Sequence, residues 1–239
     1  MKLNKGIFSS YILLLILGVI SMDAFGGLFG FGGKEKWKEE VLLHDGHTIV
    51  VERSQSRGGR HEIGQEPPIK EQSITFTLPG SNKVIVWKDE FSKDIGHCNF
   101  DLLAMHVLNN TPYIATTPYG CLAYNKWGRP NPPYVFLKFN GNEWQRISLN
   151  EFPSEFKNIN LVINTLAHEK KLVSQGLVSA EMVRKLNSSL KQEEFKTILR
   201  EPLKTGSAGV SCPKLVYYKG AWVSPGNSIG RRMMDRRVK

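Results

Sequence analysis

Between Trp37 and Pro153, apolar and polar residues alternate in short runs that are separated by Gly, Pro, Asn and Asp. Runs of this length with a period of two predict β-strands, and Asp-Gly or Asn-Gly pairs between two runs predict tight hairpin turns. The expected turns lie at Asp45-Gly46, Pro79-Gly80, Asn109-Asn110 and Asn140-Gly141. Four hairpins in succession predict an antiparallel β meander, folded as a sandwich or an open barrel.

The pattern changes after Phe152. The segment "NTLAHEKKLVSQG" predicts a short helix that ends at Gly176, because glycine is common just beyond the last turn of a helix. Ser179 is a good N-cap for a second helix in "AEMVRKLNSSL", whose apolar positions have helical spacing. A third short helix is expected around Phe195, and "KLVYYKGAWVS" predicts a last hairpin that turns at Lys219-Gly220.

These elements predict an α+β fold, in which an antiparallel β meander is followed by short helices and a C-terminal β-hairpin. We expect a single domain over residues 37–225, β-rich at 37–153, helical at 160–201 and ending in a hairpin at 213–224. The Gly/Phe-rich segment 25–36 has neither a strand nor a helix period and predicts a linker. The tail 226–239 carries four arginines in its last nine residues and has little to bury, so we expect it to be exposed or disordered.

The first 24 residues have the order of a secretory signal peptide. Two lysines in "MKLNKGIFSS" precede the apolar run "YILLLILGVI", and the small residues of "SMDAFGG" follow it. This apolar run is shorter than the stretch of about 20 residues that an ordinary membrane-spanning helix needs. We therefore expect cleavage after Ala24 and a periplasmic or secreted protein, with an uncleaved N-terminal membrane anchor as the alternative.

The chain is basic, with a formal charge of +10 over 239 residues. Loss of the signal segment removes Lys2, Lys5 and Asp23, which lowers the charge only to +9. A charge of this size attracts anionic surfaces and polymers but does not select one of them. Nucleic acid is not an expected partner, because the signal segment directs the chain away from it.

The sequence has three cysteines, Cys98, Cys121 and Cys212, so an oxidising compartment allows one disulfide and three different pairings. We expect the pair Cys98–Cys121, because a hairpin between these residues would return the chain on itself. Three buried thiols are the alternative. In either case one cysteine at least is left without a disulfide partner.

His44 and His47 flank the expected turn and would face each other across it, but the sequence places no third ligand near them. Because zinc sites generally use three or four protein ligands, we expect exposed turn residues here, and we expect neither a metal nor a cofactor. Cys98 lies beside His97 but precedes a strand, whereas nucleophilic cysteines usually occupy a special backbone position such as a helix N-terminus. A structural role for Cys98 is therefore favoured.

The segment "TPYGCLAYNKWGRPNPPYVF" has the most unusual composition in the chain, with aromatic residues among prolines, glycines and two cations. A rigid loop with exposed aromatic faces suits stacking on sugars or on the side chains of a partner. The alternative is that the rings pack beneath their own loop. The candidate binding residues are Tyr119, Tyr124, Trp127, Arg129 and Tyr134.

Three segments carry a resemblance: "HTIVVERSQSRGGRHEIGQ", "TPYGCLAYNKWGRPNPPYVF" and "INTLAHEKKLVSQGLVSAEMVRKLN". In these segments, and over most of the expected mature chain, the sequence resembles a group of uncharacterised exported bacterial proteins. The resemblance implies export and one compact unit. It implies no activity and assigns no residue a catalytic role.

Together these observations predict a non-catalytic, envelope-associated binding or accessory protein that meets an envelope protein, a glycan or an anionic membrane surface. The alternative is a hydrolase that acts on cell-wall or other anionic material. A deep pocket that gathers His97, His106, Cys121 or Glu62 would favour the hydrolase. Scattered, exposed positions for these residues would favour the binding protein.

Overall fold

The computed structural model describes residues 33–204 and 211–237. The expected signal peptide at 1–24 and linker residues 25–32 lie outside the described residues. The first strand begins at Glu35, so the last two residues of the expected linker belong to the folded domain.

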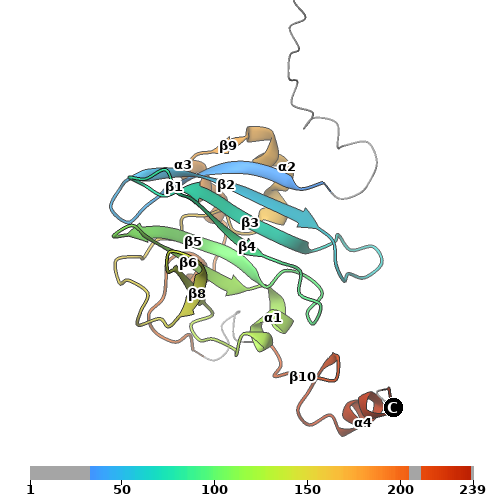
Figure 1. The fold of residues 1–239 in the computed structure, drawn as a ribbon. Helices are drawn as coiled ribbons and strands as arrows, with labels where there is room; N and C mark the ends of the chain where they lie inside the picture. Colours follow the sequence, from blue (N-terminus) through green and yellow to red (C-terminus); the bar gives the residue numbers. More distant parts are fainter. Residues whose placement is uncertain (1–32, 205–210, 238–239) are drawn as a thin grey trace, which may run out of the picture. The chain divides into compact units, whose positions relative to one another are not determined.

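The strands form two antiparallel sheets and a terminal hairpin. Sheet 1 has the order β4-β3-β2-β1-β9 and contains β1 (Glu35–Leu42), β2 (Thr48–Arg57), β3 (Ile69–Thr77), β4 (Val84–Asp89) and β9 (Leu177–Val178). Sheet 2 has the order β5-β6-β7-β8 and contains β5 (Phe100–Leu108), β6 (Thr111–Pro118), β7 (Val135–Phe139) and β8 (Trp144–Ile147). Only β9 is parallel to its neighbour in these sheets. The expected α+β class and the antiparallel meander are confirmed (Figure 1).

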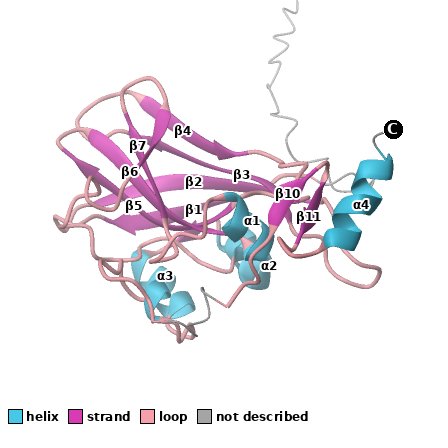
Figure 2. Ribbon diagram, turned by 90° about the horizontal axis from the view of Figure 1, so that it is seen from below, coloured by secondary structure: helices cyan, strands magenta, loops and turns pink. Residues whose placement is uncertain are grey.

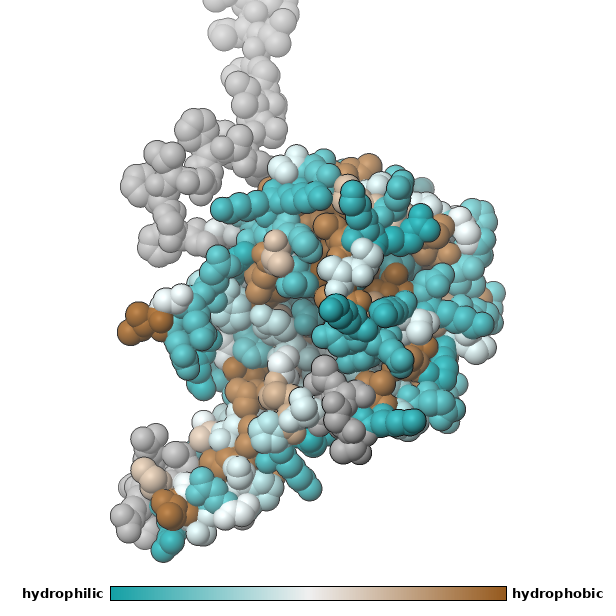
Figure 3. Space-filling view, turned by 180° about the vertical axis from the view of Figure 1, so that it is seen from behind, coloured by the Kyte–Doolittle hydropathy of each residue, from teal (hydrophilic) through white to brown (hydrophobic). Residues whose placement is uncertain are grey.

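The two sheets face each other across a hydrophobic core. Alternate residues of each strand point into this space, as the period of two requires. Sheet 1 contributes Val41, Val51, Ile74 and Phe76, and sheet 2 contributes Phe100, Leu102, Met105 and Ile114. Isolated apolar side chains remain on the surface, and in Figure 3 hydrophobic residues form separate patches among predominantly hydrophilic ones.

Two further hydrophobic clusters complete the domain. The second face of sheet 2 is covered by the segment after β8, where Phe152, Phe156 and Ile198 pack against Leu103 and Phe136. The helical region covers sheet 1 near β1. Its apolar residues pack against Trp37 of β1 and comprise Val162, Leu172, Val178 and Val183.

A buried ion pair joins these parts. The Glu39 carboxylate is 0% exposed and accepts hydrogen bonds from the Trp37 indole N–H at 2.7 Å and from Arg53 at 3.1 Å. It also accepts a hydrogen bond from the Val162 N–H at 3.0 Å, and Arg53 in turn donates to the Val162 carbonyl at 2.9 Å. Both charges are thus matched by partners within the domain, which burial of charge requires.

Three of the four expected turns connect the strands as predicted, and the turn at Asp45-Gly46 differs in detail. Asn109 and Asn110 both have positive φ, 49° and 59°, as a type I′ turn demands at its two central positions. At the first hairpin only Gly46 has positive φ, and the Leu43 N–H donates to the His47 carbonyl at 2.8 Å. The loop therefore has three residues, His44 to Gly46, and is not the tight two-residue turn that an Asp-Gly pair predicts.

Two of the expected helices are confirmed. α2 (Thr165–Gln175) ends at Gly176, which has a φ of 68°. α3 (Ala180–Asn187) begins after Ser179, whose hydroxyl accepts a hydrogen bond from the Met182 N–H at 3.2 Å. The third expected helix is reduced to one 3₁₀ turn, η1 (Glu193–Phe195).

A helix that was not expected, α1 (Gly120–Lys126), lies inside the segment expected to be a rigid loop. The terminal hairpin of β10 (Val216–Tyr218) and β11 (Ala221–Val223) is confirmed, and α1 lies beside β10 (Figure 2). The tail 226–239 was expected to be exposed or disordered. Disorder is wrong for α4 (Ser228–Arg237), where Asp235 pairs with Lys219 at 2.6 Å, but Ser228, Ile229, Arg232 and Met233 are exposed as expected. Among residues 33–204 and 211–237, no helix has the length and apolar character needed to span a membrane.

Candidate functional site

The disulfide links α1 to the C-terminal segment and not to β5. Cys121 pairs with Cys212, and Cys98 is a buried free thiol, so the expected pair Cys98–Cys121 is wrong. Cys98 points into the space between the sheets, where its Sγ lies 3.8 Å from the Gln72 amide nitrogen. The chain turns into α1 at Gly120 and carries Cys121 to the surface instead. Burial also raises the pKa of the Cys98 thiol well above its usual range, so it is poorly suited to act as a nucleophile.

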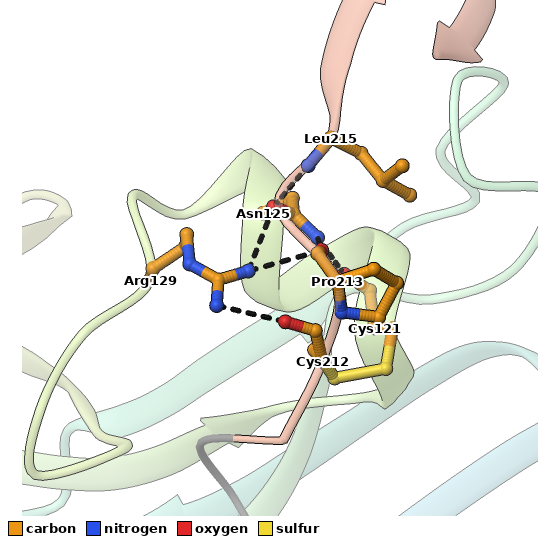
Figure 4. Close-up of a disulfide and its surroundings, with 6 residues drawn as sticks. All are labelled: Cys121, Asn125, Arg129, Cys212, Pro213 and Leu215. Atoms are coloured by element: carbon orange, nitrogen blue, oxygen red, sulfur yellow. Dashed lines mark hydrogen bonds between the residues drawn. A yellow bond between two sulfur atoms is a disulfide. The ribbon is translucent and has the colours of Figure 1, made fainter. Parts of the chain in front are cut away.

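Side chains of α1 and of the loop after it hold the chain from Cys212 to Leu215 (Figure 4). The Asn125 amide donates to the Pro213 carbonyl at 2.9 Å and accepts from the Leu215 N–H at 2.9 Å. Arg129 donates to the carbonyls of Cys212 and Pro213 at 2.8 and 3.1 Å. Two polar side chains of segment 117–136, those of Asn125 and Arg129, therefore bind the chain's own C-terminal segment.

The five candidate binding residues do not form one exposed aromatic surface. Tyr134 is 3% exposed, and its hydroxyl donates to the carbonyls of Glu194 and Thr197. Trp127 packs partly against the core, and Tyr119 is half-buried beside the His97 ring. Arg129 holds the C-terminal segment, and Tyr124, which is 4% exposed, lines a pocket. Binding by these residues stays a prediction, and Tyr124 is the one that the fold places in the pocket described next.

This pocket, which we call the disulfide pocket, has a volume of about 350 Å³ and lies beside the Cys121–Cys212 bond. Segments that are far apart in the sequence meet there: the start of β5, the end of β6, α1, η1 and the chain around Cys212. Its lining is Asp101, Thr117, Pro118, Gly120, Cys121, Tyr124, Pro133, Gln192, Glu194, Phe195, Ser211 and Cys212. This set of described residues contains two carboxyl groups and no Lys, Arg or His.

Asp101 is the most perturbed group of the pocket. Burial raises its pKa to about 7, the nearby charge of Asp89 adds to the rise, and Arg53 opposes it. Within the described residues, the Asp101 carboxyl takes part in no hydrogen bond or ion pair. A half-buried carboxyl without partners that lines a pocket is a candidate for ligand contact, since structural carboxyls are normally satisfied.

Asp89 provides the contrast. It too is buried with a raised pKa, but its carboxylate accepts hydrogen bonds from the backbone N–H groups of Asn99 and Phe100, both at 2.8 Å. The Asn99 side-chain amide donates a third, at 2.8 Å. Asp89 is thus a structural residue that ties the end of β4 to the start of β5.

A slightly larger pocket, of about 390 Å³, lies over the polar end of sheet 1, between the first residues of β1 and the end of β4. It is lined by charges of both signs, including Lys34, Lys88, Glu71 and Glu90, which are exposed or half-buried. Its one deeply buried ionisable group is Asp89, which already has its partners. Nothing in its lining favours a particular ligand, so the disulfide pocket is the stronger candidate.

The residues whose meeting would favour a hydrolase are scattered. The His97 Nδ1 is hydrogen-bonded to the Cys98 carbonyl at 2.6 Å, and Glu62 is exposed in the loop between β2 and β3. His106 lies in the core beside Phe156, and Cys121 is held in the disulfide. Of these four residues, Cys121 is the one that lines the disulfide pocket.

His44 and His47 point in different directions. His47 is exposed and lies 3.2 Å from the Asp45 carboxylate, whereas the half-buried His44 turns toward His106, with a ring-centroid separation of 6.1 Å. The expectation of exposed turn residues is therefore correct for His47 and wrong for His44. Among the described residues, no three His, Cys, Asp or Glu side chains are grouped in a way that could hold a metal.

His106 predicts a pH dependence of stability. Its Nε2 faces the Asn158 carbonyl at 3.2 Å and so carries the proton, and its buried Nδ1 has no partner within the described residues. Burial lowers the pKa of His106 to about 4, from about 6.5 in the unfolded chain. Since the unfolded state binds the proton first as pH falls, the free energy of unfolding should fall from pH 6.5 to 4, by up to about 3 kcal/mol from this group.

The measurement is urea unfolding of the wild type and of His106→Phe at several pH values between 4 and 8. Phenylalanine preserves the stacking on Phe156, whose ring lies 4.6 Å from that of His106, and it removes the titration. The difference between the two curves isolates the contribution of the His106 imidazole. It removes the contribution of Asp101, whose raised pKa makes the free energy of unfolding change with pH in the opposite direction. Parallel curves would show that His106 does not titrate as its burial requires.

Sequence reasoning missed the two carboxyls of the disulfide pocket. One signal was present, because Asp101 interrupts the apolar run "FDLLAM", where a charged residue is unusual. No comparable signal marks Glu194, which lies in a polar segment next to Glu193.

No protein-family model, curated protein or solved structure matches this chain. The resemblance to exported bacterial proteins therefore stays a prediction.

Proposed function

We propose that this chain is an exported, non-catalytic binding or accessory protein of the cell envelope, and that the disulfide pocket holds part of its envelope ligand. One observation carries the proposal. Asp101 is a half-buried carboxyl without a partner among the described residues, and it lines a concave site together with a second carboxyl and two aromatic rings. Concave, partly apolar sites with a few polar groups are the usual form of ligand pockets.

Two features support an envelope location. The Cys121–Cys212 disulfide suits an oxidising compartment outside the cytosol. The first 24 residues have the composition of a secretory signal. The charge of +9 expected after removal of the signal peptide would also attract the protein to anionic envelope polymers over a long range.

The test is affinity capture from an envelope extract on the immobilised, oxidised chain, with mass spectrometry of what is retained. In Gln192→Trp an indole would fill the pocket, because Gln192 is half-buried in its lining. Lys191→Trp is the matched control, since Lys191 is exposed and outside the lining. We expect a component that the wild type and Lys191→Trp retain and that Gln192→Trp loses at least tenfold. Equal retention by all three proteins would refute a role for the pocket.

A second candidate function is a glycoside hydrolase, and a specific observation favours it. Such enzymes use two carboxyl groups, one of which stays protonated near neutral pH and acts as the acid. Asp101, with a pKa of about 7, and Glu194 line one pocket and have the required chemical types. Release of soluble fragments from cell-wall polysaccharide, abolished by Asp101→Asn, would favour this function over binding alone.

A further inference from the structure

Glu194 is a second carboxyl residue in the lining of the disulfide pocket, and no described residue neutralises it. Glu194 is 3% exposed and lines the disulfide pocket, and among the described residues its carboxylate accepts no hydrogen bond and forms no ion pair. Its backbone carbonyl, by contrast, is held by the Tyr134 hydroxyl at 2.9 Å. A buried carboxylate costs folding free energy unless a partner offsets the loss of water. The buried Glu194 and the half-buried Asp101 line one pocket without a described partner, which indicates that a partner comes from outside the chain.

We propose that the disulfide pocket binds a protonated primary amine carried on an apolar stem. This inference rests on the proposed function and names the chemistry of its ligand. The ammonium group would donate hydrogen bonds to the carboxyl groups that line the pocket, Asp101 and Glu194. The stem would contact the apolar part of the lining, which comprises Pro118, Tyr124, Pro133, Phe195 and the disulfide.

The surrounding charges agree with a cationic ligand. The lining residues include no basic group, although the whole chain carries a formal charge of +10. Arg129 stacks on the Tyr124 ring at 5.1 Å, but it lies outside the lining, and its guanidinium is bonded to the carbonyls of Cys212 and Pro213. An anion would meet two carboxyl groups here, although Arg53 lies close enough to oppose the rise in the pKa of Asp101. The apolar walls also favour an organic cation over a hydrated metal ion, which needs several oxygen ligands.

The experiment uses the full oxidised chain and two probes of equal stem length, n-pentylamine and the neutral N-pentylacetamide. Binding is measured by titration calorimetry at pH 7.5. We expect the amine to bind at least tenfold more tightly than the amide. Asp101→Asn and Glu194→Gln should each weaken amine binding by tenfold or more. Glu193→Gln, an exposed neighbour outside the lining, should change it less than twofold.

Thermal unfolding separates loss of the site from loss of the fold. Asp101→Asn removes a half-buried carboxyl that has no hydrogen-bond or ion-pair partner among the described residues, so its unfolding temperature should equal or exceed that of the wild type. Lower stability together with lost binding would overturn the assignment of Asp101 as a ligand-contacting residue.

Other outcomes distinguish this inference from the proposed function. Equal binding of amine and amide, or tighter binding of calcium chloride than of the amine, would overturn the cationic amine as ligand. So would failure of the amine to bind at all. In each of these cases the proposed function still stands if Gln192→Trp abolishes capture of the envelope component. If the amine binds tightly but Gln192→Trp still captures the envelope component, the amine site is supported and its role in the envelope is refuted.

Discussion

Removal of the Cys121–Cys212 disulfide is expected to lower the free energy of unfolding by about 4 to 5 kcal/mol. The two cysteines are 91 residues apart, so the bond closes a long loop in the unfolded chain. A cross-link of this span removes much of the conformational entropy of the unfolded state, and the loss grows with the logarithm of loop length. We therefore expect a larger effect here than from removal of any single hydrogen bond.

The comparison is between urea unfolding of the oxidised wild type and of the double variant Cys121→Ser/Cys212→Ser. Asn125→Ala is the matched control, because it keeps the covalent bond and loses the hydrogen bonds to Pro213 and Leu215. That control should cost about 1 to 2 kcal/mol. A double variant no less stable than Asn125→Ala would mean that the covalent link adds nothing to the contacts around it.

Thiol counting checks the pairing itself. The oxidised protein should present one reactive thiol in denaturant, from Cys98, and none while folded, because Cys98 is 0% exposed. Peptide mapping should recover Cys121 linked to Cys212. Recovery of a Cys98–Cys121 peptide would contradict this arrangement of the chain.

The strands and turns were predictable because their signals are local. Asn109-Asn110 and Lys219-Gly220 adopt positive φ within the turns themselves, and the flanking residues alternate with the period of a strand. Ser179 and Gly176 mark helix ends in the same local way. Such signals depend on a few neighbouring residues, so one sequence is enough to find them.

What the sequence could not supply depends on contacts between distant segments. α1 is only seven residues long, and Tyr119 at its N-cap position makes no side-chain capping bond, so neither length nor cap marks it. The disulfide partner of Cys121 is set by where the C-terminal segment docks. The candidate site has the same origin, because Asp101 and Glu194 are brought together only by the packing of η1 near the start of β5.

Glu39→Ala is expected to lower the free energy of unfolding by about 3 to 5 kcal/mol. Arg53 is 3% exposed, and its charge is offset by Glu39 and by the Val162 carbonyl. Without the carboxylate, a buried guanidinium would keep a single neutral acceptor, and the Trp37 and Val162 N–H groups would lose theirs. An uncompensated buried charge is among the most destabilising changes known for single substitutions.

Glu52→Ala is the matched control, because Glu52 faces Lys36 at 4.0 Å across the same two strands, on the exposed face of sheet 1. Exposed pairs contribute little, so this variant should stay within about 0.5 kcal/mol of the wild type. The double variant Glu39→Leu/Arg53→Met should recover most of the loss, since it removes both buried charges and fills their space. If Glu39→Ala and Glu52→Ala lowered the free energy of unfolding by the same amount, the expectation would be wrong. Arg53 would then have to reach water or another anion in the absence of Glu39.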